Sequence, residues 1–131
     1  MPEQIPDTTG FWSYTIAPGW QVFAGKTAFD NEQLSLRFAR PNDYWFHVHD
    51  LPGSHVVLSG EQGIAPSRVL LEKAAAIAAW HSKARQSSRC SVDYTRAVNV
   101  SKPKGTPLGT VSITRNKLLK VKPGLPEPNV D

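Results

Sequence analysis

The feature that most constrains the fold is one long helical pattern, residues 66–86, set among short segments with strand character. Within it Leu70, Ala74 and Ile77 recur at three- and four-residue steps. At 1.5 Å per residue such a helix would be about 30 Å long. Six of the nine residues in 74–82 are Ala or Ser, so the helix can lie close to whatever it covers. A sheet is the simplest surface for it to cover.

Short runs punctuated by Pro and Gly fill most of the remaining chain. A hairpin is predicted around Pro18-Gly19. A short helix is predicted over residues 28–40, with Asp30 or Asn31 as its N-cap. Strands are predicted over residues 14–16, 21–24, 43–49, 54–59, 89–95, 97–100, 109–114 and 118–121. Together these elements predict an α+β domain, with a largely antiparallel sheet covered by one long helix plus a short helix.

A chain of 131 residues fits one compact domain. We expect its core to span residues 10–123 and residues 124–131 to be a frayed tail. The single cysteine, Cys90, cannot form an internal disulfide and is expected to be a small buried side chain. No apolar run approaches the roughly 20 residues of a membrane span, and the N-terminus lacks the features of a secretory leader. A soluble, cytoplasmic protein is expected, of undetermined oligomeric state.

Charge is distributed unevenly along the chain. Residues 1–80 hold five Lys/Arg and eight Asp/Glu, a net charge of −3, whereas residues 81–122 hold ten Lys/Arg and Asp93 alone, a net charge of +9. Like charges in this number repel one another unless a partner uses them, so a polyanion is the expected partner. The alternative is a solvated basic face.

Residues 43–55 combine three of the four histidines with two aspartates and three adjacent aromatic residues. In a strand, Trp45, His47 and His49 would share one face, and His55 would return on the next strand after a tight turn. We expect Trp45 to be exposed on a basic sheet, where it could stack on bases of single-stranded or looped RNA.

The same histidines leave a metal site open as an alternative. His47, His49 and His55 could bind an ion, with Asp43 or Asp50 completing the shell. That arrangement would predict a metal-dependent hydrolase or nuclease. The other interpretations are histidines satisfied by hydrogen bonds in a polar groove and histidines in direct contact with a ligand.

Residues 101–109, here called the lysine loop, carry Lys102 and Lys104 on a proline-spaced backbone, with Gly105 allowing close approach. Such a loop suits contact with phosphate, and Arg96 lies nearby in the sequence. The order of residues in a P-loop is absent, so nucleotide hydrolysis is not expected. A solvated loop is the alternative.

Five blocks of sequence, in this order, resemble the NFACT-R family, the RNA-binding domain of NFACT proteins. The blocks are residues 25–34, 43–57, 72–82, 92–95 and 100–111. The resemblance covers about residues 10–123, and the chain is similar to a free-standing form of a module that usually closes a multidomain protein.

The resemblance implies an α+β fold that binds structured RNA, such as tRNA or rRNA, and associates with ribosomes in translation quality control. No catalytic residue and no cofactor are expected. By resemblance the shared surface comprises Asp43, His47, Asp50, Gly53, His55, Lys102, Lys104 and Gly105. The predicted RNA-binding set leaves out Gly53 and adds Trp45 and Arg96 from the residue patterns above: it is Asp43, Trp45, His47, Asp50, His55, Arg96, Lys102, Lys104 and Gly105.

Overall fold

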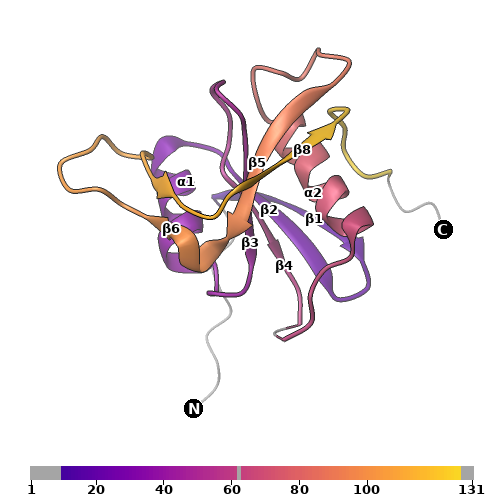
Figure 1. Ribbon diagram of the computed structural model, residues 1–131, viewed down its shortest axis with the longest axis horizontal. Coiled ribbons are helices and arrows are strands. Elements are labelled where there is room, and N and C mark those ends of the chain that lie inside the picture. Colours follow the sequence, from indigo (N-terminus) through magenta and orange to yellow (C-terminus); the bar gives the residue numbers. More distant parts are fainter. Residues whose placement is uncertain (1–9, 62, 128–131) are drawn as a thin grey trace.

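The computed structural model describes residues 10–61 and 63–127, and its architecture is α+β, as predicted (Figure 1). A six-stranded sheet has the order β1-β2-β4-β3-β5-β8, and β6 and β7 form a separate pair. All neighbouring strands of the large sheet are antiparallel. The strands are β1 (Phe11–Ala17), β2 (Trp20–Gly25), β3 (Tyr44–Val48), β4 (Val56–Ser59), β5 (Cys90–Arg96), β6 (Val100–Ser101), β7 (Ser112–Ile113) and β8 (Lys117–Val121).

Helix α1 (Ala28–Gln33) begins at a different cap from the one predicted. The extended residue Thr27 is the N-cap, and its side-chain oxygen accepts the backbone N–H of Asp30 at 3.1 Å. The prediction of Asp30 or Asn31 as the cap is therefore wrong. The chain continues directly into a π-helical segment, Leu34–Phe38. The short helix predicted over residues 28–40 is therefore an α-helix followed by a π-helix.

Helix α2 (Arg68–Trp80) begins at the N-cap Ser67 and is shorter than the predicted 66–86. Its end is fixed by Ser82, whose hydroxyl donates to the carbonyl of Ala79 at 2.6 Å and accepts the N–H of Ala84 at 3.0 Å. Those bonds replace the next helical turn and direct the chain toward β5. Within the described residues, no helix is both long and apolar enough to cross a membrane.

The sheet is covered on both faces, because alternate residues of β3 enter two different hydrophobic clusters. On one face α2 packs against Phe46 and its neighbours. The small side chains predicted to allow a close approach, Ala74, Ala75, Ala78 and Ala79, are all buried in this cluster. On the other face Trp45 packs with Leu34 of the π-helical segment. Figure 1 shows α1 and α2 on opposite sides of the sheet.

Two segments in the second half of the chain can be compared with their predictions. The predicted strand 97–100 is a 3₁₀ turn over Ala97–Asn99 followed by the two-residue β6. The tail expected to fray begins with Gly124, whose N–H donates to the carbonyl of Ala76 in α2 at 3.1 Å. The last part of that tail, residues 128–131, lies outside the described residues.

Candidate nucleic-acid interface

Trp45 belongs to a buried polar cluster. Its side chain is 3% exposed, and its indole Nε1–H donates to Ser35 Oγ at 2.9 Å. Ser35 Oγ lies 2.7 Å from His55 Nδ1. Ser35 Oγ thus joins the indole of Trp45 and the imidazole of His55 in one hydrogen-bonded group. The prediction of an exposed Trp45 is wrong, since the π-helical segment covers this face.

His55 and His47 lie close together, with ring centroids 5.6 Å apart. Burial, followed by the charge of His47, lowers the pKa of His55 to about 4. Burial also lowers the pKa of His47, whose Nδ1 donates to the carbonyl of Val48 at 2.6 Å. Both imidazoles are therefore neutral at pH 7 and serve as hydrogen-bonding groups of the interior. His55 is buried, which contradicts the expectation that it lies at the surface, whereas His47 is half-buried.

His49 points to a different set of partners. Its Nδ1 lies 2.7 Å from Asp93 Oδ2, and its Nε2 lies 3.1 Å from Asp50 Oδ2. The hydrogen bond to Asp93 is the main cause of its raised pKa. Over residues 10–61 and 63–127, no three His, Cys, Asp or Glu side chains lie close enough together to hold a metal ion. The alternative centre of His47, His49 and His55 is not assembled, because His49 faces Asp93.

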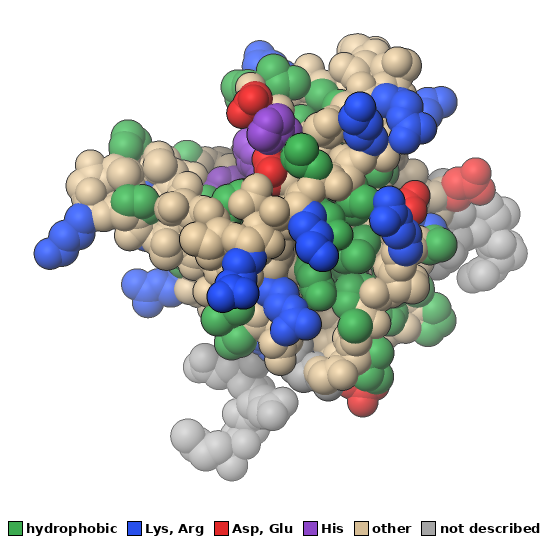
Figure 2. Space-filling model, in the orientation of Figure 1, with side chains coloured by type: hydrophobic (Ala, Val, Ile, Leu, Met, Phe, Trp, Pro, Cys, Tyr) green, Lys and Arg blue, Asp and Glu red, His purple; other side chains and the backbone are tan. Residues whose placement is uncertain are grey.

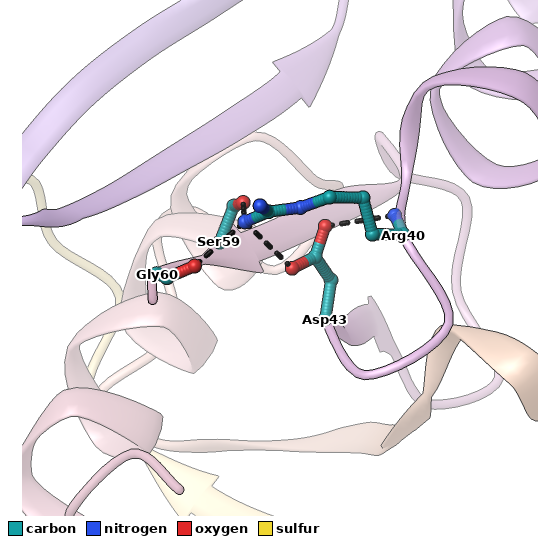
Figure 3. A network of polar contacts seen from close by, with 4 residues as sticks. All are labelled: Arg40, Asp43, Ser59 and Gly60. Carbon is teal, nitrogen blue, oxygen red and sulfur yellow. Dashed lines mark hydrogen bonds and ion pairs between the residues drawn. The ribbon is translucent and has the colours of Figure 1, made fainter. Parts of the chain in front are cut away.

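Asp43 has a structural role in the turn that precedes β3 (Figure 3). It is 3% exposed, and its carboxylate accepts the N–H of Arg40 at 2.9 Å and lies 3.5 Å from Nη2 of the same residue. That guanidinium also donates to Ser59 Oγ at 2.7 Å and to the Gly60 carbonyl at 2.6 Å. The carboxylate is thus enclosed by protein, which contradicts the expectation that Asp43 lies at the surface. Asp50, by contrast, is exposed in its turn.

The lysine loop is tied to α1 by one carboxylate. Glu32 Oε1 lies 2.8 Å from Lys102 Nζ and accepts the Gly109 N–H at 3.0 Å. The bond to Lys102 is the main reason that the pKa of Glu32 is lowered. Lys102 is therefore engaged within the protein, whereas Lys104 and Gly105 lie at the exposed tip. Of the two lysines predicted to contact phosphate, Lys104 is exposed and Lys102 is half-buried.

A cleft of about 550 Å³, here called the tyrosine cleft, opens beside the N-terminal half of α2. Its lining residues include Tyr44, Tyr94, Arg96, Arg115 and Lys117. The two tyrosine rings are 6.4 Å apart, and the Arg96 guanidinium lies 6.0 Å from the Tyr44 ring. Strand register explains the grouping, because Tyr44 pairs with Arg96 and Tyr94 pairs with Lys117.

The tyrosine cleft has the chemistry of a nucleic-acid contact. Figure 2 shows Lys and Arg side chains around hydrophobic ones on the face that carries β5 and β8. None of the described residues that line the cleft is acidic. Aromatic rings can stack on bases and cations can pair with phosphates, so the cleft offers contacts to the base and to the phosphate of a nucleotide. Of the predicted set, the cleft contains Arg96. Tyr44 and Tyr94 were not among the predicted site residues.

Comparisons with known proteins identify relatives of the chain. A family model described as NFACT protein RNA binding domain matches residues 11–115. The chain is 36% identical over 121 residues to the Rqc2 homolog RqcH of Bacillus subtilis, covering 92% of this chain and 21% of that protein. It is 26% identical over 115 residues to coiled-coil domain-containing protein 25 of Danio rerio, covering 85% of this chain and 55% of that protein.

A solved structure has the same fold. The C-terminal part of the fibronectin/fibrinogen-binding protein from Streptococcus suis matches with a TM-score of 0.82 and 34% identity, over 93% of this chain and 49% of that chain. The chain thus spans about a fifth of the RqcH protein and about half of the other two chains.

Proposed function

The chain belongs to the family of NFACT protein RNA binding domains, and from this premise we propose that it binds RNA through the tyrosine cleft. The observation that carries the proposal is the pairing of two tyrosine rings with Arg96, Arg115 and Lys117 in one cleft. Stacking of a base on an aromatic side chain contributes about 1–3 kcal/mol, and it tolerates any sequence because every base has a flat face. The cations supply the contacts to phosphate.

The RNA that fits this site has unpaired bases. The deep, narrow major groove of an RNA duplex hides its base edges, whereas loops and single strands can place a base on a ring. Structured RNA with exposed loops, such as tRNA or rRNA, therefore suits the cleft. Lys104 and Gly105, exposed on the lysine loop, extend the basic surface available to the phosphate backbone.

Similarity to the Rqc2 homolog RqcH supports a place for this module in translation quality control, in association with the ribosome and hence in the cytoplasm. RNA contact through the tyrosine cleft would be its contribution to such an assembly.

Titration of the protein with labelled tRNA and with ribosomes, at several salt concentrations, tests the proposal. Replacing Arg115 and Lys117 together with alanine should weaken binding at least tenfold. It should also reduce the slope of log K against log salt by about 1.5, because each neutralised phosphate contributes about 0.7–0.9. The matched control is Lys120→Ala with Lys122→Ala, which removes the same charge from outside the cleft.

Two results would contradict the proposal. Wild-type binding that stays in the millimolar range at low salt would exclude a role in RNA binding. Equal losses in the cleft variant and in the control variant would mean that net charge, and not the tyrosine cleft, determines affinity.

A further inference from the structure

A second basic cleft, of about 410 Å³, opens beside the C-terminal end of α2. We call it the tryptophan cleft. Its lining residues include Trp12, Lys26, Ser54, His81, Lys83 and Arg85. None of the lining residues in the described part of the chain is acidic. The cleft therefore combines an aromatic ring with three cations, as the tyrosine cleft does.

The indole of Trp12 is held in place and yet accessible. Its ring stacks on the imidazole of His81, with centroids 4.3 Å apart and planes 18° apart. His81 is fixed in turn by the Tyr14 hydroxyl, 2.7 Å from its Nε2. Burial, followed by the charge of Arg85, lowers the pKa of His81 to about 4, so the supporting ring is uncharged at pH 7. Trp12 remains 39% exposed.

The cations of the tryptophan cleft belong to residues that are hydrogen-bonded to the rest of the protein. The N–H of Lys83 donates to the Pro52 carbonyl at 2.9 Å. Arg85 Nε donates to the Trp80 carbonyl at 2.6 Å, and its guanidinium lies 4.7 Å from the Trp80 ring. Less side-chain entropy is lost when a guanidinium that is already oriented binds an anion. Lys26 completes the set, with its Nζ 5.8 Å from the Trp12 ring centroid.

Both clefts lie on the sheet face that α2 covers. Strand register places one residue from each strand in a single row across the sheet: Trp12, Ala24, Val56, Phe46, Tyr94 and Lys117. The middle of the row is buried under α2, and its two ends belong to the two clefts. Four strand spacings of about 4.8 Å separate Trp12 from Tyr94, a distance of about 19 Å.

We propose that the tryptophan cleft is a second RNA-binding site, which takes one nucleotide of a single-stranded segment with its base against Trp12 and its phosphate between Lys26, Lys83 and Arg85. This inference rests on the proposed function, because it assigns both clefts to one RNA strand. A span of about 19 Å corresponds to about six nucleotides at 3.4 Å each, and the path over α2 lengthens it. Joining the two contacts in one strand raises affinity far above that of either alone.

The test uses two single-stranded oligonucleotides, one of three and one of twelve nucleotides. The short one is expected to bind twice per protein and the long one once. Trp12→Leu, which removes the flat ring, and Lys83→Ala, which removes an exposed cation, should each lower the affinity for the long oligonucleotide about tenfold. Trp12→Leu should also reduce the number of short oligonucleotides bound from two to one, and the fluorescence quenching caused by RNA should decrease with it.

The possible outcomes separate this inference from the proposed function. In one outcome, the Lys83→Ala and Trp12→Leu variants bind the long oligonucleotide as the wild type does, and the Arg115→Ala, Lys117→Ala variant binds it poorly. That result would show that the tryptophan cleft is not a binding site, and it would support the tyrosine cleft. The reverse pattern overturns the tyrosine cleft and retains the tryptophan cleft. Because Lys83 is exposed, its replacement keeps the test valid even if Trp12→Leu folds poorly.

Discussion

Mild acid should destabilise this domain, because His55 is buried as a neutral imidazole. The pKa of His55 is lowered to about 4 in the folded protein, against an ordinary value of 6.5. Between these values the unfolded chain binds a proton that the folded protein does not. The free energy of unfolding therefore falls as the pH drops below 6.5, and the loss levels off below about 4.

The size of the effect follows from the two pKa values. At pH 5 an unfolded His55 is almost fully protonated and the folded one is about 90% neutral, which corresponds to a loss of about 2 kcal/mol. The lowered pKa values of His81 and His47 add to this loss. His49 acts in the opposite direction, since its raised pKa gives stability that is present at low pH and is lost as the pH rises.

Urea denaturation at pH 7 and pH 5 measures the change, and His55→Gln isolates it. The variant keeps a polar side chain next to Ser35 but cannot titrate. It should be less stable than the wild type at pH 7, yet its free energy of unfolding should fall by about 2 kcal/mol less between pH 7 and pH 5. The same pH dependence in both proteins would refute the assignment of a lowered pKa to the buried His55.

Two further predictions concern close contacts. A Cβ at Gly53 would lie 2.7 Å from the Cβ of Ser82. Gly53→Ala should therefore lower the free energy of unfolding, measured by urea denaturation, by about 1–3 kcal/mol. Unchanged stability would show that the turn moves freely. Lys102→Ala should loosen the lysine loop from α1 and speed hydrogen exchange at the Gly109 amide. Lys104→Ala, the control, should leave that exchange rate unchanged. Equal exchange rates at Gly109 in the two variants would contradict the anchoring role of Lys102.

Local patterns predicted the elements of this fold well, because alternation and punctuation act over a few residues. The β1–β2 hairpin, β3, β5, β8 and the α2 region were all anticipated. Boundaries were less accurate where a side chain ended a helix, as Ser82 does after α2.

The location of the site was harder to predict, because burial depends on residues far apart in the sequence. Trp45 is covered by the segment that contains Leu34 and Ser35, and nothing in the strand itself indicates that cover. Lys102 pairs with Glu32, which lies 70 positions earlier. The excess of cations in residues 81–122 did predict a basic surface, but its aromatic partners depend on the register between β3 and β5.

With both faces of the sheet covered, only its two edges present backbone groups that another strand could pair with. At one edge, β8 carries Lys117 and Lys120, and lysine on an edge strand discourages strand addition. At the other, β1 shifts register between Thr15 and Ala17, an irregularity that interrupts a continuous ladder. Both features disfavour pairing of two copies edge to edge. They leave side chains, more than backbone groups, as the means by which a partner can recognise the domain.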